Sequence, residues 1–312
     1  SLRERVIRIS GTAHYDRAEV RKQMPARPIL VIGATGTVGR HVVRGLGAQG
    51  WQVRAMTRNR EGAHFPANTE IVQGDLTIPD TLDQCLDGVD SVFLVWTAPP
   101  AATDAALARI AKRARRIVFL SAPLKTPHPF FQQPNPARDL ALHIERIIET
   151  SGLEWTFLRP GMFAANAKEF WGPQVRAGNT VRWPLLSAPT APVDERDIAA
   201  VGVRALTENG HHEKEYVLTG PQSLTQHEQI ATIGHVIGRA LTIEEISRDE
   251  ARRTWSAVMP AAVADMLMDA WTAAVGQPAY VTSTVQDVTG TPARTFADWT
   301  KDNASAFLSA VD

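Results

Sequence analysis

Three glycines spaced over seven residues form the group in this sequence best suited to binding a ligand. Gly33, Gly36 and Gly39 follow an apolar run at 29–32 and precede a helical pattern. Glycines at this spacing allow a tight turn and a close approach to a pyrophosphate, and the helix N-terminus adds free N–H groups and partial positive charge. Because strand, turn and helix signals are all present, the segment predicts a dinucleotide site. The expected contacts are Gly33, Thr35, Gly36, Thr37, Val38 and Gly39.

The residues after the second predicted strand indicate which dinucleotide is bound. NAD sites usually carry an acid about 20 residues past the glycines, for the ribose 2′-hydroxyl. Here Arg58 and Arg60 come first, and no acid occurs until Glu61. A guanidinium suits a 2′-phosphate, and one charge-assisted bond of about 1.5–3 kcal/mol gives roughly a 10- to 100-fold preference. Arg58 therefore favours NADP(H), unless both arginines are only solvated loop charges.

Further polar and aromatic residues follow the later strands, at the sheet edge where ligands bind in such folds. Asp75 and Leu76 follow the third strand, and Asp75 could accept from an adenine amine or instead cap the next segment. Trp96 and Thr97 end the fourth strand, and Ser121 ends the fifth. All five are expected at the cofactor site.

The elements that must position these residues alternate between strands and helices. Short apolar runs predict strands, and amphipathic or Ala-rich stretches predict helices. The strands are expected at 29–32, 51–56, 70–72, 92–95, 117–120 and 155–158, and the helices at about 39–49, 82–86, 101–115 and 139–150. This order predicts an α/β fold, a doubly wound parallel sheet of the Rossmann type.

The rest of the chain is expected to flank this sheet. Residues 1–27 are predicted to be an N-terminal extension, either a loose tail or an arm on a partner subunit. Residues 28–160 form the dinucleotide-binding domain, and 161–312 a smaller, mainly helical substrate-binding cap interleaved with the sheet edge. Cap elements are expected at 195–207, 216–218, 224–240, 249–257 and 260–274. The segment 123–136 holds five prolines and is predicted to be a long loop, as in lids.

Composition excludes several function classes. The chain has 312 residues, 44% of them apolar, with 33 Lys and Arg against 33 Asp and Glu. This balance points to neither a nucleic-acid nor a membrane partner. One cysteine, Cys85, cannot form an internal disulfide and is expected to pack in the core. The first 27 residues carry seven Arg or Lys and no apolar stretch typical of a secretory signal. A soluble, cytoplasmic protein without a metal site is expected, and a homodimer stays open.

Three stretches of the sequence resemble the NmrA-like group of atypical short-chain dehydrogenases. They are the glycine segment, Gly-Asp-Leu at 74–76, and Trp-Thr-Phe-Leu-Arg-Pro-Gly-Met-Phe at 155–163, and the resemblance covers roughly 28–240. The group includes NADPH-dependent quinone, azo-dye and triphenylmethane reductases, isoflavone-type reductases and non-catalytic cofactor sensors. The resemblance implies that the C-terminal helices close over the substrate. It also implies that one turn lies against the nicotinamide, formed by Pro160, Gly161, Met162 and Phe163.

The sequence departs from the related extended enzymes at their Tyr-x-x-x-Lys pair. In those enzymes the Lys lies four residues before a Glu. Counting back from Glu145 therefore places Ala141 at the Lys position and Ala137 at the Tyr position. Some quinone reductases of the group carry His at the Lys position, but here the nearest is His143, two residues on. Two residues rotate a helix by about 200°, so His143 should face away from the cofactor. Ser121 and His143 remain the catalytic candidates, with a structural role open for His143.

Three functions are compatible with these residues. The first is an NADPH-dependent reductase of a conjugated or aromatic small molecule, in which delocalisation makes a strong protein acid less necessary. The second is a non-catalytic NADP(H) sensor, and the third a cyclase or isomerase that retains the cofactor. For the reductase, aromatic side chains would offer flat walls, although each could be ordinary packing. The expected walls are Phe130, Phe131, Phe163, Trp171 and Trp183.

Overall fold

A single parallel sheet organises the first part of the molecule. The computed structural model describes residues 27–123 and 125–309, so the expected extension lies outside these residues except for Arg27. The seven strands lie in the order β3-β2-β1-β4-β5-β6-β9, and every neighbouring pair is parallel. This arrangement confirms the predicted doubly wound sheet. The strands are β1 Ile29–Ile32, β2 Val53–Thr57, β3 Thr69–Gln73, β4 Ser91–Val95, β5 Arg116–Leu120, β6 Glu154–Pro160 and β9 Lys214–Leu218.

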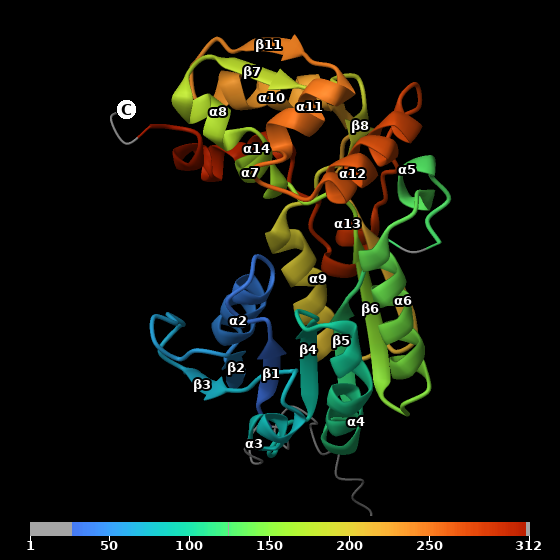
Figure 1. Ribbon diagram of the computed structural model, residues 1–312. Coiled ribbons are helices and arrows are strands. Elements are labelled where there is room, and N and C mark those ends of the chain that lie inside the picture. The colour runs from blue at the N-terminus through green and yellow to red at the C-terminus, as the bar shows by residue number, and fades with distance from the viewer. Residues whose placement is uncertain (1–26, 124, 310–312) are drawn as a thin grey trace, which may run out of the picture.

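Helices cover both faces of the sheet because each buries an apolar stripe against it (Figure 1). On one face lie α2 (Gly39–Ala48) and α9 (Glu195–Thr207), which pack against each other. On the other face lie α3 (Leu82–Cys85), α4 (Thr103–Arg113) and α6 (Pro136–Glu149), with short 3₁₀ turns at Pro79–Thr81 and Pro100–Ala102. Cys85 is buried in this second cluster, as expected.

A second group of elements forms a cap at the carboxyl end of the strands (Figure 1). It has its own apolar cluster, rich in tryptophan. Two small sheets join it: β7 with β11 in parallel and β8 with β10 antiparallel. The cap strands are β7 Thr180–Trp183, β8 Pro189–Thr190, β10 Leu224–Thr225 and β11 Thr242–Glu245. The cap helices are α7 Asn166–Phe170, α8 Gly172–Ala177, α10 Gln226–Val236, α11 Arg248–Trp255, α12 Ala261–Ala274 and α14 Phe296–Asp302, followed by a 3₁₀ turn at Ala304–Ala306.

Residues 195–207 and 216–218, which were expected among the cap elements, instead belong to the main sheet and its covering layer as α9 and β9. β9 pairs with β6 from Thr156–Lys214 to Pro160–Leu218, and so becomes the edge strand of the main sheet. α9 lies beside α2 and packs on β4, β5 and β6, and α13 (Thr284–Thr289) packs against α9 and β9. The paired residues, from Thr156 with Lys214 to Pro160 with Leu218, are 58 positions apart, and pairing at this distance depends on tertiary structure, which local periodicity does not reveal.

The proline-rich stretch 123–136 also differs from the predicted loop. Pro129–Gln132 form a short helix, α5, with His128 at its N-cap. Asn135 caps α6, which begins at Pro136, three residues earlier than expected. In both helices the proline occupies the first turn, where its missing N–H would have no partner anyway. No helix among the described residues is long and apolar enough to cross a bilayer.

Candidate active site

The glycine segment forms a tight turn between β1 and α2. Gly33 has a φ of +80°, and its carbonyl accepts a hydrogen bond of 3.0 Å from the N–H of Gly36. A Cβ at Gly39 would lie 2.1 Å from the Gly33 oxygen, so helix and turn approach as closely as the sequence predicts. Thr35 and Gly36 are exposed, whereas Val38 is buried in the core, which leaves only its backbone for a ligand.

Arg58 and Asp75 lie together in an open hollow beside β2 and β3. Arg58 is exposed, as a group that binds a 2′-phosphate must be. The Asp75 Oδ1 accepts from the Thr77 N–H at 2.8 Å and from the Thr77 hydroxyl at 2.7 Å, so Asp75 stabilises the turn that follows β3. These bonds, with a smaller contribution from Arg58, hold the pKa of Asp75 below its usual value. The Leu76 side chain is buried in the core.

Trp96 and Thr97 follow the end of β4, one strand from the glycine turn. The Trp96 indole N–H donates to the Ala98 carbonyl at 2.6 Å, which fixes its ring beside the sheet edge. Thr97 is exposed. Both residues therefore lie on the edge expected for a dinucleotide.

Ser121 belongs to a buried charge network that the sequence did not reveal. Its hydroxyl donates to Glu145 Oε1 at 2.6 Å. Arg159 donates to the same carboxylate from Nε at 3.0 Å and from Nη2 at 2.6 Å, and its Nη1 donates to Glu215. The side chains of Arg159 and Glu145 are only 3% and 2% exposed. Since its proton is held by a buried carboxylate, Ser121 is a poor proton donor in this arrangement.

His143 lies on the side of α6 that faces α4. Its Nε2 is 3.3 Å from the Thr103 hydroxyl oxygen, and its side chain is exposed. Ala141, at the expected Lys position, is buried, whereas Ala137, at the expected Tyr position, is exposed. The two-residue rotation thus points His143 toward a neighbouring helix.

An apolar cavity of about 170 Å³ lies between the end of β5, the start of α6, the turn after β6 and the cap. Phe130 and Phe131 form one wall, with ring centroids 4.9 Å apart in an edge-on arrangement. The short helix α5 that carries them packs against α12 (Figure 1). The remaining lining comes from Ala122, Pro123, Gln133, Pro134, Asn135, Arg138, Pro160, Gly161, Met162, Met266, Leu267 and Ala270.

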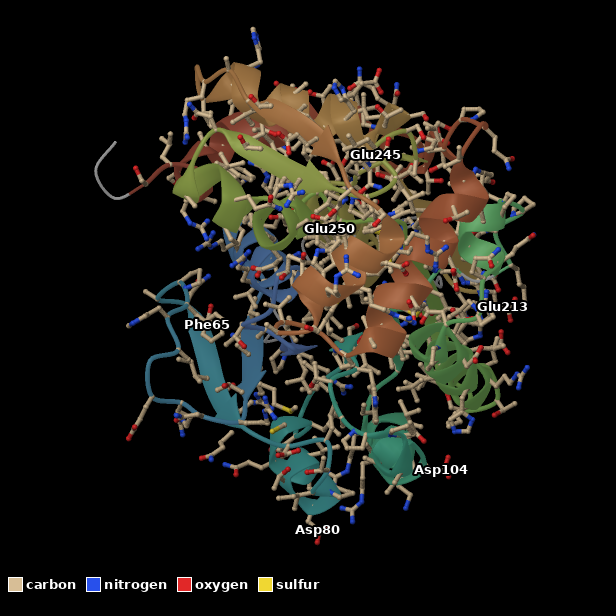
Figure 2. The ribbon with its side chains drawn as sticks, turned by 45° about the horizontal axis from the view of Figure 1, so that its top comes forward. Phe65, Asp80, Asp104, Glu213, Glu245 and Glu250 are labelled. Atoms are coloured by element: carbon tan, nitrogen blue, oxygen red, sulfur yellow. The ribbon has the colours of Figure 1, made fainter. Side chains whose placement is uncertain are left out.

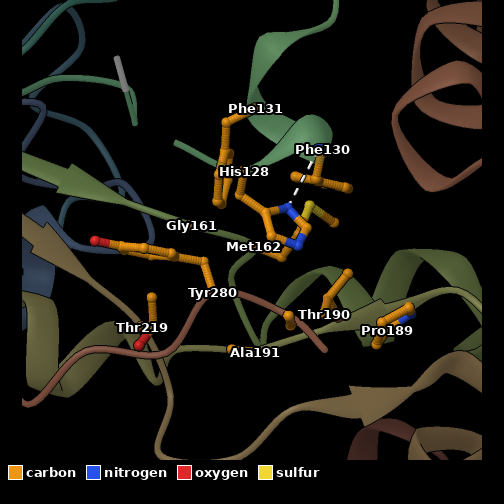
Figure 3. Close-up of a pocket in the computed structure, with 11 residues that line it drawn as sticks. His128, Phe130, Phe131, Gly161, Met162, Pro189, Thr190, Ala191, Thr219 and Tyr280 are labelled. Atoms are coloured by element: carbon orange, nitrogen blue, oxygen red, sulfur yellow. Dashed lines mark hydrogen bonds between the residues drawn. The ribbon is translucent and has the colours of Figure 1, made fainter. Parts of the chain in front are cut away.

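A smaller pocket adjoins this cavity and shares Phe130, Phe131, Gly161 and Met162 (Figure 3). His128 fixes the start of α5 at this pocket. Its ring nitrogen Nδ1 accepts from the Phe130 N–H at 3.2 Å, and its Nε2 lies 3.0 Å from the Pro278 carbonyl. These partners assign the proton to Nε2. Tyr280 also lines this pocket (Figure 3).

Sequence reasoning missed Arg138, His128, Tyr280, Met266 and Leu267. Of these, only His128 carried a local signal, because a polar residue before Pro129 is typical of a capped helix start.

Two of the expected aromatic walls lie elsewhere. Trp171 and Trp183 are each only 2% exposed and pack in the cap cluster, where the Trp183 indole N–H donates to Gln226 at 2.6 Å. They support the cap from inside because large aromatic groups are the main source of core burial. Phe163 is half-buried, pairs with Val193 through its backbone and packs on the sheet core. Glu245 and Glu250 mark the cap in Figure 2, and Phe65 marks the region near β3.

Comparison with known proteins identifies one family and two related reductases. The model of the NmrA-like family matches residues 25–286. The chain is 40% identical over 283 residues to the (4-alkanoyl-5-oxo-2,5-dihydrofuran-3-yl)methyl phosphate reductase of Streptomyces griseus, an alignment that spans 89% of this chain and 99% of the relative. It is 36% identical over 293 residues to the NAD(P)H azoreductase of Xenophilus azovorans, with 90% and 100% covered.

Among solved structures, the triphenylmethane reductase of Citrobacter sp., complexed with NADP(H), has the same fold. The TM-score is 0.75 at 20% identity, and the match spans 88% of this chain and 99% of that one.

Proposed function

The chain belongs to the NmrA-like family, and from that premise we propose that it is an NAD(P)H-dependent oxidoreductase that reduces a conjugated or aromatic small molecule, such as a quinone or an enone. The observation that carries the proposal is the apolar cavity next to the turn after β6, walled by Phe130 and Phe131. The names of its relatives from S. griseus and X. azovorans, a dihydrofuranone reductase and an azoreductase, support it.

The residues around the glycine turn fit a nicotinamide dinucleotide. The turn and the start of α2 would hold the pyrophosphate. Because Gly39 has no Cβ, the helix N-terminus can lie close against the turn and present its N–H groups to the ligand. Arg58 would bind the 2′-phosphate, which makes NADPH the preferred form; the NADP(H) bound in the Citrobacter reductase supports this preference. Trp96, Thr97 and Ser121 would lie along the dinucleotide, and Pro160–Phe163 beside its nicotinamide. Residues 28–160, together with α9, β9 and α13, would then form the cofactor domain, and the remaining later elements would form the cap.

The chain's own residues would mainly bind and orient the acceptor. When bound, the cofactor supplies a hydride. Phe130, Phe131 and Leu267 would hold a flat ring and exclude water from its faces. Ala137 and Ala141 stand where related enzymes have Tyr and Lys, so no phenol protonates the product from α6. A conjugated acceptor tolerates this, because its developing charge is delocalised and water can deliver the proton.

A substrate panel tests the proposal. We expect NADPH oxidation, followed by absorbance, in the presence of quinones, enones or azo dyes, and little with unconjugated ketones. Calorimetric binding of NADPH should accompany it. If NADPH binds but no member of the panel is reduced, the reductase proposal is wrong and a sensor or a non-redox enzyme takes its place.

A further inference from the structure

Arg138 places one positive charge in the wall of the apolar cavity. Among the described residues that line this cavity, it alone is charged. The others are apolar or, like Gln133 and Asn135, neutral amides. The cavity therefore combines flat apolar walls with a single cation at the start of α6.

The guanidinium has donors to spare. Its Nη1 donates to the Phe131 carbonyl at 2.6 Å, and its Nε is 3.9 Å from Asp139. The Asp139 side chain is 72% exposed, so this pair is screened by water and adds little. A guanidinium carries five N–H donors in a planar fork. Nη2 has no hydrogen-bond partner among the described residues, which leaves one edge of the fork for a ligand.

The charge affects which ligand can fill the cavity. The Arg138 side chain is only 26% exposed, and a ligand in the cavity would remove more of its water. Desolvating a cation without an anionic partner costs free energy, whereas a planar oxyanion restores it through two parallel hydrogen bonds. The charge of Arg138 would therefore lower the affinity of the cavity for a neutral ligand and raise its affinity for an anionic one.

We propose that Arg138 is a specificity residue, which selects conjugated substrates that carry an anionic substituent such as a phosphate, sulfonate or carboxylate. The inference rests on the proposed function, because it describes the same cavity. A purely structural role, in which Arg138 only fixes Phe131, would affect charged and uncharged substrates equally.

Paired quinones separate these roles. The probes are naphthoquinone sulfonate and unsubstituted naphthoquinone, and the variants are Arg138→Gln, Arg138→Lys and the control Arg146→Gln on the exposed side of α6. We expect Arg138→Gln to lower kcat/KM for the sulfonate by about 10- to 100-fold, mainly through KM, and for naphthoquinone by less than about 3-fold. The kcat/KM of Arg138→Lys for the sulfonate should lie between the values of the parent and Arg138→Gln. Arg146→Gln should have the same kcat/KM as the parent for both quinones.

A binding measurement without turnover keeps the inference separate from the proposed reaction. Naphthalene sulfonate cannot be reduced, so its Kd reports the cavity alone. We expect Arg138→Gln to weaken it by the same factor, with the Kd of NADPH and the Tm unchanged. Equal losses for both quinones, or no loss for the sulfonate, would overturn the role of Arg138. If neither quinone is reduced but the Kd of naphthalene sulfonate still depends on Arg138, the proposed reaction is wrong and the anion site is supported.

Discussion

The surface proposed to bind the cofactor at the glycine turn is mainly backbone, whereas the surface proposed to bind the substrate in the apolar cavity is mainly side chain. The turn comes from one continuous segment in which the Gly33 carbonyl and the Gly36 N–H bond to each other. The cavity is assembled from several separate elements, namely α5, α6, the turn after β6 and α12, and α12 lies far along the chain from the others. A backbone surface recognises what all dinucleotides share, whereas a side-chain surface can change with its residues. Substitutions in the two regions should therefore differ in kind: the turn decides whether any substrate reacts, and the cavity decides which one.

The largest effect is expected from Gly36→Val. A Cβ at Gly36 would be 3.2 Å from the Gly33 oxygen, which is tight but tolerable, and the side chain would project from an exposed position toward the dinucleotide. We expect NADPH affinity to fall at least about 100-fold in calorimetry, with the fold retained. Gly178→Val is the control, because nothing lies within 4 Å of its added Cβ and its backbone is extended. Unchanged affinity would remove the turn from the site.

Gly39→Val should behave differently. Its Cβ would meet the Gly33 carbonyl carbon and oxygen at 2.8 and 2.1 Å, so the helix must move. We expect loss of folding stability in thermal unfolding together with loss of binding. This pair of glycines tests whether the turn acts through the ligand or through the packing of α2.

Arg58→Ala should show whether the turn region also distinguishes cofactors. We expect NADPH to weaken by roughly 10- to 100-fold and NADH to stay within a few-fold, because only NADPH carries the 2′-phosphate. Titration of both cofactors into the variant measures this, with Arg60→Ala as a control. Equal losses for NADPH and NADH would mean that Arg58 contacts another part of the dinucleotide.

Ser121→Ala tests a residue between the two regions, since Ser121 follows β5 directly and precedes Ala122 and Pro123 of the cavity lining. Its hydroxyl is already bonded to Glu145, so we expect kcat for naphthoquinone to fall at most about 10-fold. The pH profile of the reaction should show no titration of a catalytic tyrosine, because position 137 is an alanine. A loss of about 100-fold or more would make Ser121 the proton source.

His143→Ala should have the smallest effect. Its ring is exposed and makes a single, long contact of 3.3 Å with Thr103, so its removal should cost less than about 1 kcal/mol in urea unfolding and leave the rate unchanged. Efficient reduction of an unconjugated ketone, lowered by about 100-fold in this variant at unchanged Tm, would make His143 the acid.

What could be predicted from the sequence follows the same division. Strands β1 to β6 and the glycine turn depend on signals within a few residues, such as the apolar run before Gly33. The short strands β7, β8, β10 and β11 exist only because distant partners pair with them, so periodicity did not indicate them. Trp171 and Trp183 have the residue type of a substrate wall, but cap packing turns them inward. Arg138 was missed because a charge on a helix is usually solvated, and the cavity that it lines also requires residues of α5 and α12.

The ion pair between Glu145 and Arg159 has a consequence for how this chain can vary. One partner comes from α6 and the other from β6, and both are almost fully buried. Losing Arg159 leaves the buried Glu145 carboxylate with only the Ser121 hydroxyl, at a cost of about 3–5 kcal/mol, and losing Glu145 leaves Arg159 with only Glu215. Replacing both by apolar groups of similar volume can be nearly neutral. Positions 145 and 159 should therefore tolerate exchange only as a pair, and any directed evolution of the cavity will have to keep both or change both.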